Sequence, residues 1–178
     1  MQRGKHGYAA EFGHMMIDPM GPECPCGQRG CWERYASGSG LAYLAQQRAR
    51  QGRLGRIVEQ VSGNVELIRS EHVLSISGQD DDETEDLMCE FARWIAVGLV
   101  NLAHVVDPEV MVLGGGVGAS LGDYVETVRS EFSELIYQPQ QRELPGIVLA
   151  ELGEQAGAIG AALLPEFTGD FALKVERR

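Results

Sequence analysis

The sequence predicts an α/β domain in which helices cover a sheet that is at least partly parallel. Two short apolar runs with strand character, at 110–113 and 146–152, alternate with segments whose apolar residues recur at helical spacing. The chain has 178 residues, enough for one domain, and its hydrophobic content of 44% is that of an ordinary globular protein. We therefore expect a single α/β domain over residues 1–165, followed by a loosely ordered tail at 166–178.

The first half of the chain divides into a loop-rich segment and a helix. Residues 1–33 are rich in Gly, Pro and Cys and are predicted to form strands and loops. Residues 36–53 are predicted to be a helix that Ser37 or Ser39 caps and that Gly52 ends. Between 54 and 82 the pattern is ambiguous, with short helices possible at "IVEQV" and "VELI" before an acidic loop.

The clearest helix covers the stretch "DDETEDLMCEFARWIAVGLVNLAHVVDP". Acidic residues crowd its first turn, Pro108 stops its last turn, and its apolar residues cover a wide arc. These apolar positions are Leu87, Phe91, Trp94, Ile95, Gly98, Leu99, Leu102 and Val106. We expect this helix to be central to the core, with Cys89 as an inert core residue.

The last third alternates strands and helices. "VMVLGGGVGAS" is a strand that ends in three glycines, and a helix is expected at 123–137. "GIVLAEL" at 146–152 is the second strand. "EQAGAIGAALLPEF" is predicted to be a small-residue helix that packs closely on a neighbour.

Composition excludes several classes of function. Fifteen basic and 26 acidic residues give a net charge of −11 without a basic stripe, which argues against nucleic acid as the main ligand. No run of about 18 apolar residues is present, and the first residues lack the apolar region of a signal peptide. We expect a cytoplasmic protein that does not bind membranes, in which clustered cysteines indicate metal binding or catalysis rather than disulfides.

Three of the four cysteines lie within eight residues, in the pattern His14-x9-Cys24-x-Cys26-x4-Cys31. Three thiolates and one imidazole complete a tetrahedral zinc shell and leave no position for a catalytic water. The pattern thus predicts a structural zinc. The alternative is that the cysteines are small buried apolar residues or form a chance disulfide.

Two acidic residues flank this motif. Glu11 precedes His14 by three residues, and Glu33 follows Cys31 after one residue. If the loop folds around one ion, both carboxylates lie near the imidazole, where each can accept hydrogen bonds from neighbouring sugar hydroxyls. The alternative is that both are solvated surface charges.

The glycines Gly114, Gly115 and Gly116 lie between a strand and a helix. Without Cβ atoms they let backbone approach a ligand, and the next helix N-terminus favours an anion. The stretch also fits a dinucleotide-binding fingerprint, but the acid expected about 20 residues later is missing at a strand end. No P-loop motif occurs. By itself the trio is equally consistent with a tight turn.

The segment "EFGHMMIDPMGPECPCGQRGCWERYASG" closely resembles the zinc-binding and sugar-binding segment of the ROK family of repressors and sugar kinases, and above all of its bacterial glucokinases. "NLAHVVDPEVMVLGGGVG" resembles the family's helix, strand and nucleotide loop, and "AELGEQAGAIGAALL" its closing segment. The resemblance covers residues 4–165 and is strongest at 11–37 and 98–118. It implies part of the C-terminal domain of an actin-like, ribonuclease-H-like ATPase fold.

The resemblance implies specific roles for these residues. Zinc would be bound by His14, Cys24, Cys26 and Cys31. The sugar hydroxyls would be contacted by Glu11, His14 and Glu33. Gly114, Gly115 and Gly116 would form the adenosine-side loop of an ATP site in the nucleotide segment 110–120. It also implies Mg²⁺ in the full-length enzyme and a homodimer. One departure is Ala10, where the family commonly has Gly, and we expect it to need a negative φ.

Two features of the family's kinases are missing from this sequence. Neither a DxGxT phosphate motif nor the general-base Asp of family kinases occurs before Glu11, and neither Asp18 nor Asp107 is a credible substitute. We therefore expect no catalytic residue, and little activity, in these 178 residues. Three readings remain: part of a hexose kinase, the sugar-sensing domain of a repressor, or a zinc-stabilised interaction module. The sequence leaves open which hexose is bound, and whether ATP or polyphosphate is the donor.

Overall fold

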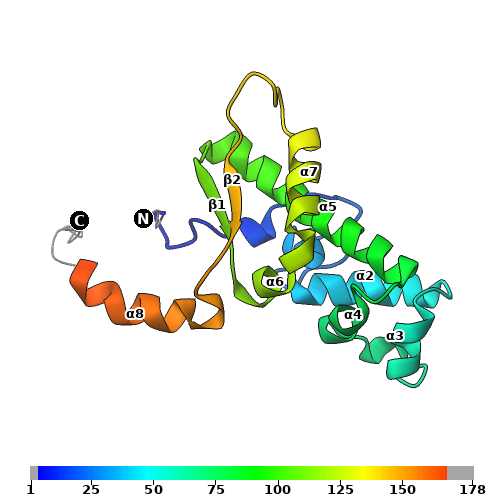
Figure 1. Cartoon of the computed structure of the whole chain (residues 1–178). Coiled ribbons are helices and arrows are strands. Elements are labelled where there is room, and N and C mark those ends of the chain that lie inside the picture. The colour runs from blue at the N-terminus through cyan, green and yellow to red at the C-terminus, as the bar shows by residue number, and fades with distance from the viewer. Residues whose placement is uncertain (1–3, 168–178) are drawn as a thin grey trace.

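A computed structural model describes residues 4–167 as helices around a small parallel sheet (Figure 1). The helices are α1 (Glu33–Ala36), α2 (Gly38–Arg50), α3 (Gly55–Gln60), α4 (Ser70–Ile76), α5 (Asp82–Val106), α6 (Gly115–Ser120), α7 (Val125–Leu135) and α8 (Ala156–Phe167). The strands are β1 (Val110–Leu113) and β2 (Gly146–Leu149). This confirms the predicted α/β class.

Helix α5 is the centre of the structure. Asp81 caps it by accepting from the Thr84 N–H, and it ends at Asp107, which takes a left-handed conformation before Pro108. Its buried residues include Leu87, Met88, Phe91, Ala92, Ile95, Ala96 and Leu99. Because α7 packs on one side and α1 and α2 on another, α5 connects the sheet to the N-terminal loops.

Helix α5 is also long and apolar enough to cross a membrane by length and composition, with a mean hydropathy of 1.3 over its most apolar window. The helix includes Glu90 and Arg93, so it is not an uninterrupted run of apolar residues. In the described structure 44% of this window is buried, and the buried residues of α5 belong to the hydrophobic core. One such helix is weak evidence for a membrane span, since a core helix passes the same test.

The other helices follow local signals in the sequence. Ser37 caps α2 through its side-chain oxygen, which accepts from the Gly40 N–H, and Gly52 follows the helix with φ +82°. The ambiguous region forms α3, a 3₁₀ turn at Val65–Leu67 and α4. Helix α6 was not predicted, since it begins within the glycine trio itself.

The two strands are parallel, in the register Val110↔Gly146 to Leu113↔Leu149. Met111 and Ile147 are buried on the face that α7 helps to cover. This arrangement places the glycine trio directly after the end of β1.

Two expectations about packing are wrong. Cys89 is exposed on the surface of α5 rather than buried in the core. The small residues of α8 are largely exposed between 156 and 163, and the helix packs mainly against the 3₁₀ turn Gly153–Gln155. In Figure 1, α8 extends to the lower left, away from the helices at the lower right. Of the expected tail 166–178, residues 168–178 lie outside the described part of the chain.

Candidate metal and sugar site

The loop before α1 brings the four predicted metal ligands together. A 3₁₀ turn at Phe12–His14 presents His14, and isolated antiparallel bridges join Met16 to Cys31 and Glu23 to Arg29. These bridges fold the loop back on itself, so that residues ten to seventeen positions apart become neighbours. The expected strands at 1–33 are thus not found in the described residues 4–33, which form isolated bridges between loops instead.

The four predicted ligands form one cluster. One donor atom from each of His14, Cys24, Cys26 and Cys31 lies within 4.8 Å of the others. The Sγ atoms of Cys26 and Cys31 are 3.6 Å apart, and His14 Nδ1 is 3.8 Å from Cys24 Sγ. In a tetrahedral zinc shell with bonds of about 2.0–2.3 Å, ligand atoms lie about 3.5–3.8 Å apart. The chemistry and spacing of the donors thus fit a zinc ion.

The thiols of this cluster differ in their environment. Cys31 is completely buried, and burial raises the pKa of its thiol to about 12. Cys26 is exposed, and hydrogen bonds, first from the backbone of Gln28 and then from Cys24, lower the pKa of its thiol. A buried thiol of this kind is converted to the thiolate when it ligates a metal cation.

His14 lies between the two predicted sugar-contacting acids. Its Nε2 is 4.0 Å from Glu11 Oε2, and its Nδ1 is 4.0 Å from Glu33 Oε2. Both carboxylates are more than half exposed, so they are accessible to a ligand in solvent. The structure therefore brings Glu11, His14 and Glu33 together, with Nδ1 toward the thiols and Nε2 toward Glu11.

The backbone before Glu11 differs from expectation. Ala10 has φ +70°, in the left-handed region, although a negative φ was predicted. The chain thus keeps the conformation that a glycine adopts easily, and Ala10 adopts it at a steric cost.

Trp32 anchors the metal cluster to α5, which the sequence analysis missed. Its indole N–H donates to the Trp94 carbonyl at 2.8 Å, and its ring lies over Gly98. A Cβ on Gly98 would lie 1.9 Å from the Trp32 ring, so only glycine allows this contact. Because Trp32 lies between Cys31 and Glu33, the contact fixes both functional residues against the core.

A second anchor lies beneath the loop. The Tyr35 hydroxyl donates to Asp18 Oδ2 at 2.6 Å, and its ring stacks on Trp94 with centroids 4.2 Å apart. Burial, followed by the nearby Asp18, raises the pKa of the Tyr35 hydroxyl, which keeps it a donor. Asp18 also accepts from the Met20 N–H, so its role is to hold the loop.

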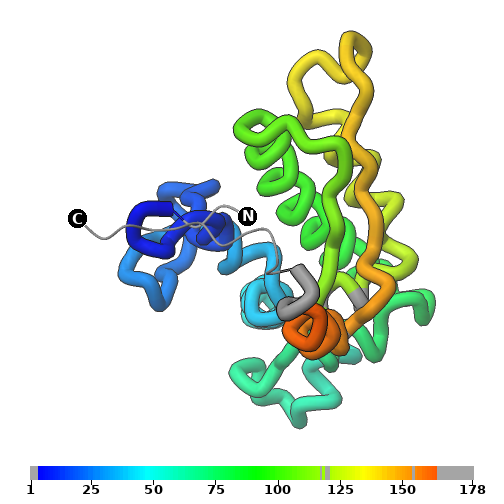
Figure 2. Tube along the Cα trace, turned by 90° about the vertical axis from the view of Figure 1, so that its left-hand side faces the viewer, coloured from blue at the N-terminus to red at the C-terminus, as the bar shows by residue number. Residues whose placement is uncertain are grey.

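The glycine trio forms a separate surface at the end of β1. Gly114 is extended, Gly115 has φ +70°, and α6 begins there. A Cβ on Gly118 would lie 2.6 Å from the Leu113 carbonyl oxygen, so this glycine lets α6 pack tightly on β1. The turn Gly153–Gln155 lies against α6 and brings the closing segment beside the trio. In Figure 2 the metal-binding loop lies on the left and β1 on the right.

Both aspartates that the sequence analysis considered as substitute bases take part in contacts that hold the structure together. Asp107 ends α5 and pairs with Arg142, and Asp18 is engaged by Tyr35, so both have structural roles.

Comparisons with known proteins agree with this geometry. The profile of the ROK family matches residues 1–166. A glucokinase from Streptomyces coelicolor is 36% identical over 165 residues, which are 91% of this chain and 52% of the glucokinase. The xylose repressor of Bacillus subtilis is 28% identical over 160 residues, covering 90% of this chain and 37% of the repressor.

One solved structure resembles the chain over nearly its whole length. It is a ROK family glucokinase from Streptomyces griseus in complex with glucose and AMPPNP, 36% identical, with a TM-score of 0.82. The match covers 92% of this chain and 53% of that one. The chain therefore spans about half the length of the glucokinases that it matches.

Proposed function

This chain belongs to the ROK family, and on that premise we propose that it is part of a glucokinase-like hexose kinase. The kinase would transfer the γ-phosphoryl group of ATP to the 6-hydroxyl of a hexose, with glucose as the first substrate to test. Identity of 36% to two Streptomyces glucokinases, one of them bound to glucose and AMPPNP, supports this proposal.

The observation that carries the proposal is the position of His14 between two exposed carboxylates. Glu11 and Glu33 can each accept hydrogen bonds from neighbouring sugar hydroxyls, and the His14 Nε2, which points away from the thiols, can contact a third. Three polar groups around one position suit a polyhydroxylated ring better than a hydrophobic ligand.

Zinc would have a structural role at this site. His14, Cys24, Cys26 and Cys31 would fill its four positions and leave none for a reacting water. Bound through Nδ1, the ion would fix the tautomer and orientation of the His14 ring toward the sugar.

The nucleotide would lie at the end of β1. Gly114, Gly115 and Gly116 would let the adenosine side of ATP approach the backbone, while Mg²⁺ would be bound elsewhere in the full-length enzyme. Phosphoryl transfer depends on positioning and on neutralising spread negative charge. Since this chain has no general-base Asp and no phosphate motif, we infer that it binds ligands without turning them over.

A second candidate is the sugar-sensing domain of a repressor. The similarity to the xylose repressor favours it, and a closed metal site beside sugar-binding groups would serve sensing without catalysis. A third is a zinc-stabilised module without catalysis. For each reading we propose a cytoplasmic protein without membrane contact, a homodimer as the oligomeric state, and no nucleic-acid contact by these residues.

Titration calorimetry with the zinc-loaded chain tests the sugar site. Glucose should release or absorb heat with the wild type, and Glu11→Gln or Glu33→Gln should weaken binding about tenfold or more, since each removes a charged acceptor. Glu23→Gln is the matched control, because Glu23 lies in the same loop but pairs with Arg29. Absence of heat with the wild type, or equal weakening by the control, would contradict the proposed sugar contacts.

A further inference from the structure

The cysteines of the metal cluster differ in how the fold holds them. Cys31 is completely buried and pairs with Met16 in an isolated antiparallel bridge. The next residue, Trp32, donates from its indole N–H to the Trp94 carbonyl at 2.8 Å. Since Trp94 belongs to α5, the backbone at Cys31 is fixed against the core. The thiol of Cys31 therefore has a fixed position and little access to solvent.

Cys26 lies instead at the tip of a tight turn, residues 23–29. A bridge between Glu23 and Arg29 closes this turn. Inside it, the Cys24 N–H donates to the Gln28 carbonyl at 2.8 Å. Cys26 itself is exposed, and the loop that contains it lies apart from the sheet in Figure 2. An oxidant in solvent therefore reaches the Cys26 thiol before it reaches the buried thiols of the cluster.

The thiols of Cys26 and Cys31 are close enough to react with each other. Their Sγ atoms lie 3.6 Å apart, whereas the sulfur atoms of a disulfide are about 2.05 Å apart. Directly after Cys26, Gly27 has φ +91°, and no atom lies within 4 Å of the position of an added Cβ. The turn thus has open space at its tip. A small shift of Cys26 toward the fixed Cys31 can close the remaining gap.

A disulfide and a zinc ion exclude each other at this pair. Thiolates hold zinc through their negative charge, which they lose when they join in a disulfide. With Cys26 and Cys31 joined, His14 and Cys24 are the ligands of the cluster that remain, whereas a structural zinc site uses four. Because loss of groups that only support metal ligands costs roughly 10–100-fold in affinity, loss of two ligands should cost about a hundredfold or more.

We propose that Cys26 and Cys31 form a peroxide-sensitive pair whose oxidation to a disulfide releases the zinc ion. The oxidant is hydrogen peroxide. The Cys26 sulfur attacks one peroxide oxygen, the O–O bond breaks, and the products are a Cys26 sulfenic acid and water. The Cys31 thiolate then attacks the sulfenic sulfur, the S–S bond forms, and the S–O bond breaks. The two thiolates together lose two electrons, and the peroxide takes up these and two protons to give two waters.

The released ion no longer orients His14, so oxidation also acts on the proposed sugar site. The His14 Nδ1 lies 3.8 Å from Cys24 Sγ, and its Nε2 lies 4.0 Å from Glu11 Oε2. Metal bound at Nδ1 fixes the ring that presents Nε2 to the sugar. Glucose should therefore bind more weakly after oxidation. This consequence rests on the proposed function, whereas the disulfide and the release of zinc rest on the metal site alone.

Peroxide treatment of the zinc-loaded 178-residue chain tests the proposal. A chromophoric chelator measures the zinc released, which should reach about one ion per chain and rise as the disulfide forms. Trypsin cleaves after Arg29 and leaves Cys31 in the peptide Gly30–Arg34. A disulfide from Cys26 to Cys31 therefore joins two tryptic peptides, which mass spectrometry detects as one species. Reduction and added zinc should restore the bound ion.

Serine variants separate this pair from the other thiols. Cys24→Ser keeps both Cys26 and Cys31, so the linked peptides should still form. In Cys26→Ser they should form about tenfold or more slowly, because the exposed thiol is gone. Cys89→Ser is the matched control: Cys89 is also exposed, but it lies on α5 outside the cluster, so this variant should release zinc like the wild type. If a variant does not fold, fragmentation of the linked wild-type peptides locates the bond and decides the question.

Three results would overturn the proposal: zinc that stays bound after peroxide treatment, zinc release with a disulfide that omits Cys26 or Cys31, or release that Cys89→Ser abolishes. A chain that binds no zinc contradicts the proposed metal site and the switch together, whereas bound zinc that peroxide does not release contradicts the switch alone. Glucose calorimetry on the reduced and oxidised chain checks the effect on His14. Equal binding in both states would show that the sugar site does not depend on the ion. Absence of binding in the reduced state would contradict the proposed sugar site, while the release of zinc is decided by the chelator.

Discussion

At the scale of single residues, Ala10 and Cys31 each have a feature that is unfavourable by itself. Ala10 holds a left-handed backbone directly before Glu11, and Cys31 buries a thiol beside the exposed Cys26. Both features accompany the folding of the loop around the cluster of His14 and the three cysteines. Each makes a prediction that a single substitution or titration can check.

Replacing Ala10 with glycine should stabilise the chain by roughly 0.5–1 kcal/mol, because relief of the left-handed strain outweighs the entropy that glycine loses on folding. Thermal unfolding measures the shift. Ala9→Gly is the matched control: the backbone of Ala9 is not left-handed, so the same change should destabilise by a similar amount. A lower midpoint for Ala10→Gly than for the wild type would show that φ at Ala10 is not positive in solution.

Zinc affinity should rise with pH. The raised pKa of Cys31 keeps its thiol protonated in the neutral range, so binding must displace at least one proton. Below its pKa, each proton displaced increases the apparent affinity about tenfold per pH unit. Competition with a chromophoric chelator between pH 6 and pH 8 measures the slope. An affinity that stays constant over this range would mean that the thiols do not ligate the ion.

At the scale of elements, aromatic contacts hold the loop against α5. The Trp32 ring over Gly98 and the Tyr35 ring on Trp94 connect the metal cluster to the most deeply buried helix. The order of Glu11, His14 and Glu33 should therefore depend on the packing of α5 against Trp32 and Tyr35.

Gly98→Ala should destabilise the chain by about 1–3 kcal/mol, although alanine favours helix, because the new methyl group overlaps the Trp32 ring. It should also weaken zinc binding, as Cys31 moves with Trp32. Gly160→Ala in α8 is the control: no atom lies within 4 Å of its added Cβ, so it should be neutral or slightly stabilising. Equal thermal midpoints for the two variants would show that Trp32 does not lie over Gly98.

At the scale of the whole molecule, residues 4–167 contain a loop with a possible metal site, a glycine surface and a sheet of two strands. The exposed valines of β1 and the exposed residues of α8 lie on elements that pack on few neighbours. These surfaces are consistent with a chain that spans about half the length of the glucokinases it matches.

The purified chain should not phosphorylate glucose in the presence of ATP and Mg²⁺, because it lacks the general base and the phosphate motif. A coupled assay for glucose 6-phosphate checks this, with the Streptomyces coelicolor glucokinase run in parallel as a positive control. Phosphorylation that stays with the chain through purification and disappears in Glu33→Gln would contradict the prediction.

The sequence by itself determined much of this protein. Periodicity identified α5, β1, α7 and β2 to within a few residues. The spacing of the cysteines and His14 predicted four side chains that the structure brings together as a possible metal site. These features depend on local chemistry: caps, breakers and ligand types can be read directly from neighbouring residues.

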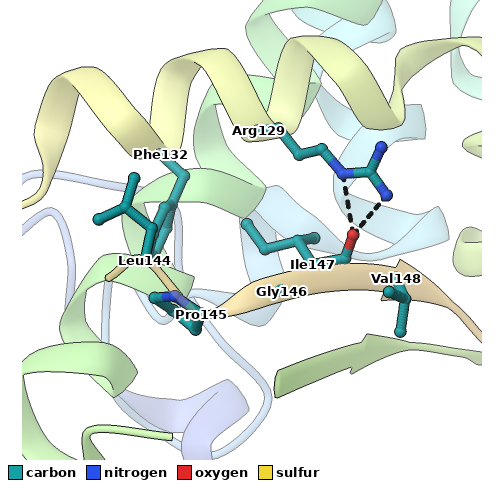
Figure 3. A pocket seen from close by; sticks show the side chains of 7 residues that line it. All are labelled: Arg129, Phe132, Leu144, Pro145, Gly146, Ile147 and Val148. Atoms are coloured by element: carbon teal, nitrogen blue, oxygen red, sulfur yellow. Dashed lines mark hydrogen bonds between the residues drawn. The ribbon is translucent and has the colours of Figure 1, made fainter. Parts of the chain in front are cut away.

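Only the tertiary structure decided the rest. It placed Glu11 and Glu33 on either side of His14, seated Trp32 on Gly98, exposed Cys89, and gave Ala10 its left-handed backbone. It also showed that Arg129 donates to the outward-facing Ile147 carbonyl on β2 (Figure 3). The physical reason is that each of these features depends on contacts between residues far apart in the chain. A local sequence pattern does not determine such contacts.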